Sequence, residues 1–252
     1  MTDYLLVHGA GQGAWSWGPV WGHLTAPEEH PPTLHKHRRA SRVHPIDLPG
    51  HGSDAGGDTA AVRLEECVQA ITKAVEREQL KNLILVGHGI AASLVIQAAK
   101  ELTVPPKRVV LVAGIIPAAQ RPLLSAYSPR MRAAFSLFSA LSSLSRQEFK
   151  LPRPVINGFV CNGMDPMEVV QLVGFFGPLP TRVLKSRYPV ADSTLPCPVT
   201  YVVLTEDKMI PRDEQLRIAE RFEGVETVEI ESCHQVMARR PKELAEVLLR
   251  YA

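Results

Sequence analysis

The stretch that most constrains this chain is residues 83–93, Leu-Ile-Leu-Val-Gly-His-Gly-Ile-Ala-Ala-Ser. Four apolar, strand-favouring residues run directly into a turn that contains two glycines, and a helix-forming sequence begins without a spacer. This order predicts a buried strand, a sharp turn and a helix. The centre of the turn is Gly89, and we expect the rest of the chain to be organised around it.

Apolar runs of strand length and amphipathic runs of helix length surround this stretch. Residues 59–79 carry apolar side chains at helical spacing with charged residues between them, which predicts an amphipathic helix. Further helices are expected at 90–102, 131–144, 166–176 and 212–222, and after Pro241. Further strands are expected at 4–7, 42–46, 108–113, 198–204 and 225–230.

The size and composition are those of an ordinary globular chain. A length of 252 residues fits one large α/β domain or two small ones, and 45% of the residues are apolar. The net charge of +2 is too small to indicate a nucleic-acid partner. No apolar run reaches the roughly 20 residues of a membrane span. Thr2 and Asp3 lead directly into a strand rather than into a secretory leader, which favours a cytoplasmic protein.

The sequence shows none of the known patterns of metal-binding or cofactor-binding residues. The four cysteines show no CxxC spacing, so we expect reduced thiols. The sequence contains no metal-ligand cluster, phosphate-binding loop or dinucleotide fingerprint. We therefore expect no cofactor and no metal. The expected partner is a small-molecule substrate, and neither a nucleic acid nor a membrane.

The turn at residues 87–91, Gly-His-Gly-Ile-Ala, resembles the nucleophile elbow of the α/β-hydrolase family, whose pattern is small-x-nucleophile-x-small. In this sequence the nucleophile position holds Gly89 instead of Ser, Cys or Asp. The resemblance implies an α/β-hydrolase fold, in which helices flank a mostly parallel central sheet and a helical cap is inserted. It also implies an oxyanion hole in which the Ile90 amide takes part.

A second glycine-rich turn follows the first predicted strand, at residues 8–13. Its glycines allow the backbone to approach a ligand closely. Read alone, it is also compatible with a plain turn. By resemblance to the family, the other oxyanion-hole amide belongs to Ala10, and Gly11 and Gln12 line the substrate site.

The last third of the chain supplies the expected acid and base. Asp207 lies between an apolar strand and a helix that begins after Pro211, where the family places its catalytic acid. His234 follows the last strand and precedes the helix that begins at Pro241, where the family places its catalytic histidine. The order elbow, acid, histidine is the one expected for this fold. The alternative for His234 is an ordinary surface-loop residue.

The region between these parts differs in character. Residues 117–190 are rich in proline and lack strand-like alternation, so the resemblance makes them the cap, with residues 1–116 and 191–252 as the two parts of the core domain. The apolar cap predicts a small, largely hydrophobic carbonyl compound or ester as substrate. The cap residues expected to line the pocket are Phe135, Phe138, Phe159, Met164, Phe175 and Phe176.

The glycine at position 89 leaves three hypotheses. In the first, the protein is an enzyme in which Asp207 orients His234 as general base, without a covalent serine intermediate, as a hydrolase, lyase or cofactor-independent rearrangement catalyst. In the second, chemistry is lost and the pocket binds a small ligand. In the third, the chain is an engineered Ser→Gly variant of a serine esterase.

Ser93 and Cys233 are poor substitutes for the missing nucleophile. Ser93 is expected in a packed helix, and the Cys233 side chain is expected to point away from His234.

Overall fold

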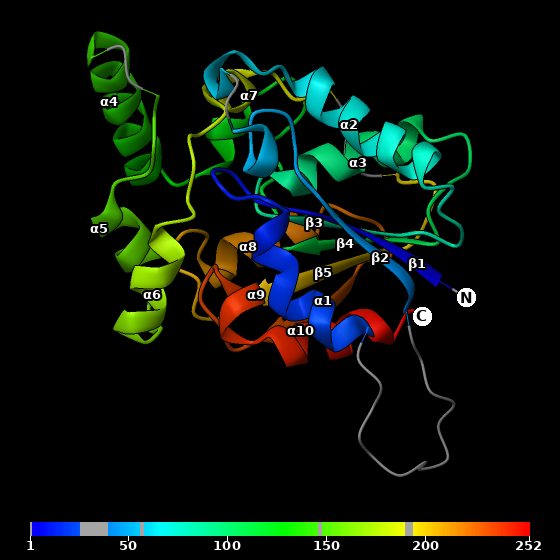
Figure 1. Ribbon diagram of the computed structural model, residues 1–252. Coiled ribbons are helices and arrows are strands. Elements are labelled where there is room, and N and C mark those ends of the chain that lie inside the picture. Colours follow the sequence, from blue (N-terminus) through cyan, green and yellow to red (C-terminus); the bar gives the residue numbers. More distant parts are fainter. Residues whose placement is uncertain (1, 26–39, 56–57, 146–147, 190–193) are drawn as a thin grey trace.

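The computed structural model describes residues 2–25, 40–55, 58–145, 148–189 and 194–252, without the side chains of 40–41, 138–139 and 141–145 (Figure 1). These residues form one six-stranded sheet in which every neighbouring pair is parallel, in the order β2-β1-β3-β4-β5-β6. The strands are β1 (Thr2–Val7), β2 (Ala40–Ile46), β3 (Ile84–His88), β4 (Arg108–Val112), β5 (Val199–Leu204) and β6 (Glu226–Ile230).

Helices cover both faces of this sheet, as the resemblance implies (Figure 1). One face packs against α2 (Leu64–Arg77), α3 (Ala91–Glu101) and α8 (Arg212–Ala219). The other packs against α1 (Gly18–Thr25), α9 (Val236–Arg239) and α10 (Pro241–Leu249). Successive strand residues alternate between the two cores, because side chains of a strand point to opposite faces. In β3, for example, Leu85 belongs to the first core and Val86 to the second.

The segment between β4 and β5, residues 113–198, carries the remaining helices and is called the β4–β5 segment below. Its described residues contain no strand, only two isolated bridges. Figure 1 shows α4, α5 and α6 stacked at one side of the sheet, while α7 lies near α2. Its elements are η4 (Leu123–Ala126), α4 (Pro129–Ser145), α5 (Arg153–Val155), η5 (Ile156–Val160), α6 (Pro166–Val173) and α7 (Thr181–Lys185).

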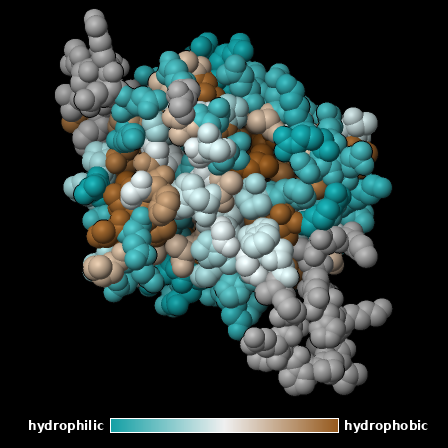
Figure 2. Space-filling view, in the orientation of Figure 1, coloured by the Kyte–Doolittle hydropathy of each residue, from teal (hydrophilic) through white to brown (hydrophobic). Residues whose placement is uncertain are grey.

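The surface of the β4–β5 segment is partly apolar. Figure 2 shows hydrophobic residues gathered at the side of the molecule where α5 and α6 lie. Met167 and Val170 on α6 are each 68% exposed, and Phe175 just after α6 is 63% exposed. None of the described helices is long and apolar enough to cross a membrane.

Most predicted elements are confirmed, with bounds that differ from the predicted ones by a few residues. The predicted helix at 59–79 is wrong in one respect: a short 3-10 turn, η3 (Thr59–Ala61), is separated from α2 by the extended residues Val62 and Arg63. The helix starts only there because the Glu66 side chain accepts a hydrogen bond from the Arg63 amide, which caps it. All four cysteines lie in the described part of the chain and are free thiols, as expected.

Candidate active site

The order of the strands places a crevice at the carboxyl ends of β1 and β3. These strands are neighbours, but the chain continues from β1 to one side of the sheet and from β3 to the other. Ligands of parallel α/β sheets bind at such a reversal. The two turns that follow these strands touch: a Cβ atom added at Gly9 would lie 2.8 Å from Nδ1 of His88. The two glycine-rich turns of the sequence therefore meet at one place.

The turn after β3 has the sharp form that its sequence predicts. Gly89 adopts a left-handed backbone with φ of 55°, and α3 begins two residues later. The Gly89 amide donates to the carbonyl of Val112, and the Gly89 carbonyl accepts from the amide of Ile115, at 3.0 and 2.9 Å. Both bonds go to the adjacent strand β4 or the residues just after it. The turn is therefore held by backbone contacts, whatever residue stands at position 89.

Asp207 and His234 form a hydrogen-bonded pair at the same edge of the sheet. Nδ1 of His234 lies 2.7 Å from Oδ2 of Asp207. The other carboxylate oxygen accepts the amides of Met209 and Ile210, at 2.7 and 3.0 Å. Both side chains of the pair are buried. Because the carboxylate accepts from Nδ1–H, the tautomer is set and Nε2 is left as an acceptor.

The free nitrogen of His234 faces the elbow. A Cβ atom added at Gly89 would lie 3.3 Å from Nε2 of His234. A side-chain atom at position 89 would therefore lie in direct reach of this base. The backbone carbonyl of His234 is held as well, since Nε2–H of His88 donates to it at 3.0 Å. Burial lowers the pKa of His88 well below its ordinary value, and the neighbouring His234 lowers it further, so His88 is a neutral support.

Two backbone amides complete the polar edge of the site. Ala10 and Ile90 both border the pocket, and the amide of neither has an acceptor among the described residues. Ile90 caps the N-terminus of α3, where the helix dipole places partial positive charge. Two unengaged amides that border the same pocket as a histidine can donate to an oxygen that carries negative charge.

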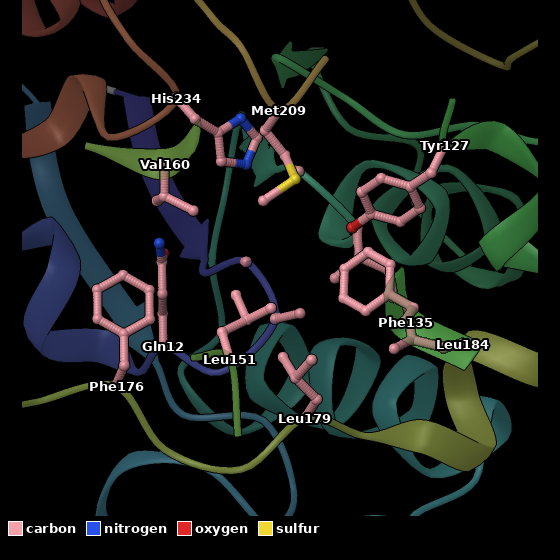
Figure 3. A pocket seen from close by; sticks show the side chains of 14 residues that line it. Gln12, Tyr127, Phe135, Leu151, Val160, Phe176, Leu179, Leu184, Met209 and His234 are labelled. Atoms are coloured by element: carbon pink, nitrogen blue, oxygen red, sulfur yellow. The ribbon is translucent and has the colours of Figure 1, made fainter. Parts of the chain in front are cut away.

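The pocket between these groups and the β4–β5 segment is narrow and mostly apolar (Figure 3). Its cavity volume is about 20 Å³, which is room for about one water molecule, so a larger ligand must displace side chains of its wall. In Figure 3, His234 and Met209 lie together at one end, and Tyr127 and Phe135 face Gln12 and Phe176 across the space. Its lining residues are Gly9, Ala10, Gln12, Gly89, Ile90, Tyr127, Phe135, Leu151, Val160, Phe176, Leu179, Leu184, Met209 and His234.

Several pocket residues expected from the sequence lie elsewhere. Phe159 is 40% exposed, Phe175 packs its ring on Trp15 at the surface, and Met164 is half-buried outside the pocket wall. Gly11 is not part of the pocket wall, and its carbonyl accepts the amide of Gly177 at 2.7 Å. Phe159 and Phe175 are placed elsewhere because an aromatic residue in a helical segment has no fixed face until the segment packs.

The remaining residues expected in the pocket either line it or have no described side chain. Gln12, Phe135 and Phe176 line the pocket. The side chain of Phe138 lies outside the described residues. Ser93 is buried in α3, where its hydroxyl donates to the carbonyl of Ile115, so it does not face the pocket. Cys233 is buried and likewise not part of the pocket wall.

Sequence reasoning missed seven lining residues, namely Gly9, Tyr127, Leu151, Val160, Leu179, Leu184 and Met209. For Met209 the sequence did offer a signal, namely its position two residues after Asp207. At this spacing an aspartate side chain commonly accepts the backbone amide, as it does here. Tyr127 had none, since it follows a short 3-10 turn whose direction only the fold sets. In the described residues, no group of three or more His, Cys, Asp or Glu is arranged to hold a metal ion.

Solved structures with this architecture include several hydrolases. An extracellular α/β-hydrolase from a Paenibacillus species has a TM-score of 0.84 at 19% identity, over 100% of this chain and 99% of that one. An esterase from Thermogutta terrifontis has a TM-score of 0.77 at 16% identity, over 100% and 89%. An Arabidopsis methylesterase has a TM-score of 0.71 at 18% identity, over 99% and 98%. At these identities the likeness concerns the fold.

The sequence itself carries the family pattern along nearly its whole length. No curated protein matches it significantly. The model of the Alpha/beta hydrolase family, in contrast, matches residues 4–247, from the first strand to the last helix. That range includes both glycine-rich turns, Asp207 and His234. The chain therefore belongs to the alpha/beta hydrolase family.

Proposed function

We propose that this chain is an enzyme that acts on a small, largely apolar carbonyl compound or ester, with His234 as general base and without a covalent enzyme intermediate. The observation that carries the proposal is the position of Nε2 of His234, 3.3 Å from the Cβ site of Gly89. A purely structural histidine has no need of a carboxylate partner on one nitrogen and a pocket on the other. The β4–β5 segment acts as the cap that closes this pocket.

In the hydrolytic form of the reaction, the nucleophile is a water molecule instead of a side chain. Nε2 of His234 takes a proton from the water while the water oxygen bonds to the substrate carbonyl carbon. The carbonyl electron pair moves to its oxygen, which the amides of Ala10 and Ile90 stabilise. When this intermediate collapses, the leaving oxygen receives the proton from His234. Asp207 holds the imidazole throughout and stabilises its protonated form.

The same groups support proton abstraction from carbon or hydroxyl, as in a lyase or a cofactor-independent rearrangement. There His234 removes a proton from the substrate, and the two amides stabilise the enolate or alkoxide that forms. A covalent route is not open to Gly89. In a serine hydrolase, loss of the nucleophile costs on the order of 10⁶ in rate. The proposed reaction therefore depends on the base and the amides alone.

A second candidate is a ligand-binding module without chemistry. It is favoured by one observation, that the only departure from the family pattern is the loss of the reactive side chain at Gly89. The pocket would then hold a small apolar ligand. A tight ligand that raises the melting temperature but is never converted supports this candidate over the enzyme.

The test is to rebuild the nucleophile and then remove the base. Gly89→Ser is expected to hydrolyse short p-nitrophenyl esters, because its oxygen would lie within reach of His234. His234→Ala in the Gly89→Ser background is expected to abolish that activity. In the native chain, His234→Ala is expected to abolish turnover of any substrate found by screening. Unchanged turnover in that variant overturns the proposal. An inactive but folded Gly89→Ser variant rules out an esterase that was engineered to glycine.

A further inference from the structure

The polar side chains of the pocket differ in whether they have a partner. Nδ1 of His234 is bonded to Asp207, and Nε2 of Gln12 donates to Oε1 of Gln235 at 2.7 Å, while Oε1 of Gln12 is buried without a partner. No hydrogen bond within the described residues engages the hydroxyl of Tyr127, which reaches the open space of the pocket. It is the third polar side chain that borders the pocket, and sequence analysis did not single it out.

Buried tyrosines elsewhere in the fold show what is usual. Tyr201 donates to the carbonyl of Gly114 at 2.7 Å, and Tyr4 donates to the carbonyl of Leu248 at 2.9 Å. A hydroxyl that leaves water without finding an acceptor is destabilising, so buried hydroxyls are normally bonded. Tyr127 is 8% exposed, and its hydroxyl is not among the buried unpaired polar atoms of the fold, so it keeps contact with the open space of the pocket. A ligand that fills this space displaces the water there, and the hydroxyl then needs an acceptor on the ligand.

The ring of Tyr127 is held so that the hydroxyl points inward. It packs against Phe135 with ring centroids 5.0 Å apart, and Phe135 in turn meets Phe149 edge to face. In Figure 3 the hydroxyl is the end of the side chain nearest the middle of the pocket. Burial raises the pKa of Tyr127, and the negative charge of Asp207 raises it further. The group therefore stays protonated and serves as a hydrogen-bond donor.

We propose that the Tyr127 hydroxyl binds a second acceptor oxygen of the ligand, apart from the carbonyl oxygen that the Ala10 and Ile90 amides receive. This inference rests on the proposed function and narrows it. The ligand is then a small apolar molecule with two oxygen acceptors, such as a diketone, a keto ester or an alkoxy ester. A site that bonds one group of its ligand discriminates against analogues that lack that group, because its own donor is left unpaired. Tyr127 is accordingly a specificity-determining residue.

Ketones that differ by one oxygen test this directly on the native chain. Hexan-2-one has one carbonyl, while pentane-2,4-dione, hexane-2,5-dione and heptane-2,6-dione place a second one at increasing distances. Dissociation constants are measured by ligand-observed NMR for the native chain, for Tyr127→Phe and for Tyr188→Phe. Tyr188 is the matched control, since its buried hydroxyl also lacks a partner but lies outside the pocket wall.

The native chain is expected to bind at least one of the diketones about tenfold more tightly than hexan-2-one, the scale of one hydrogen bond. Tyr127→Phe is expected to bring that ratio close to one, and Tyr188→Phe is expected to keep it. Thermal melting shows that both variants are folded. If hexan-2-one binds but no diketone binds better, or if Tyr127→Phe keeps the preference, the inference falls and the proposed function stands. If no ketone binds at all, the inference falls and the proposed substrate class falls with it.

Discussion

The two walls of the pocket are held in place by different means. On the wall formed by the ends of the strands, backbone bonds fix each polar group: the Gly89 turn is bonded to β4 and to Ile115, and the Asp207 carboxylate accepts two amides. On the wall formed by the β4–β5 segment, side-chain packing fixes the groups, as the ring contact of Tyr127 with Phe135 shows. The first wall is therefore suited to hold reacting atoms, and the second to select the ligand.

The first prediction tests the strand-end wall and has the largest expected effect. In the Gly89→Ser background, Asp207→Asn is expected to lower kcat by about 10³–10⁴, because the amide no longer sets the tautomer of His234. Esterase kinetics measure the loss, and circular dichroism checks the fold. The matched variant Asp165→Asn, at the N-terminus of α6 in the β4–β5 segment and outside the pocket wall, is expected to keep kcat. A small effect of Asp207→Asn means that the pair is structural.

The second prediction concerns the packing of the other wall. Phe135→Ala is expected to lower the free energy of unfolding by about 3–5 kcal/mol, because it removes a buried ring between Tyr127 and Phe149. Phe175→Ala removes the same atoms from an exposed site and is expected to cost about 1 kcal/mol or less. Urea unfolding compares the two. Equal losses would contradict the assignment of Phe135 to the pocket wall.

The third prediction concerns the backbone at the elbow. A Cβ atom at Gly87 would lie 2.8 Å from both the carbonyl oxygen of Ala91 and Cγ2 of Val95, so β3 and α3 must move apart to admit it. Gly87→Ala is therefore expected to lower the free energy of unfolding by about 2 kcal/mol. Gly18→Ala is the control, since nothing lies within 4 Å of its Cβ site. A loss at Gly87 no larger than that at Gly18 refutes the close approach.

The fourth and smallest effect is pH dependence, which belongs to the strand-end wall because residues 113–198 contain no histidine. Burial lowers the pKa of His8 to about 3, and the nearby His51 contributes. Nδ1–H of His8 donates to the Gly9 carbonyl, and its Nε2 accepts the Leu48 amide, so the neutral ring is the one that fits.

A histidine whose pKa is lowered by folding takes up protons more readily when unfolded. Its contribution to stability is therefore complete above a pH of about 6.5 and is lost as the pH falls toward 3. For His8 the expected loss at pH 5.5 is about 1.4 kcal/mol. Urea unfolding at pH 7.5 and 5.5 measures the change, and NMR titration assigns it. Protonation of His8 near pH 6.5 in the folded chain contradicts this account.

Local patterns were enough for the framework of the site. The strand, turn and helix around Gly89 are confirmed because each depends on neighbouring residues: apolar residues for a strand, then a glycine where φ is positive. The same holds for the positions of Asp207 and His234, each just after a strand of the same parallel sheet. Parallel strands bring their carboxyl ends to one edge, so residues far apart in the chain meet there.

Local patterns were not enough for the β4–β5 segment. Phe159 and Phe175 were expected in the pocket and lie at the surface, while Tyr127 and Leu184 were not expected and line it. Short helices separated by prolines carry little periodicity, so nothing in the sequence shows which side of each faces the sheet. Packing against the sheet decides that, once the whole segment has folded.

By itself the sequence determined the family framework, the glycine at the centre of the elbow turn, and the positions of Asp207 and His234 after two strands of the sheet. The tertiary structure alone decided that Nε2 of His234 faces Gly89 and that the Tyr127 hydroxyl enters the pocket without a partner. The physical reason is the range of the interactions involved. Turns and strands follow from neighbouring residues, whereas the direction of a side chain across a cavity depends on segments that meet only in the folded chain.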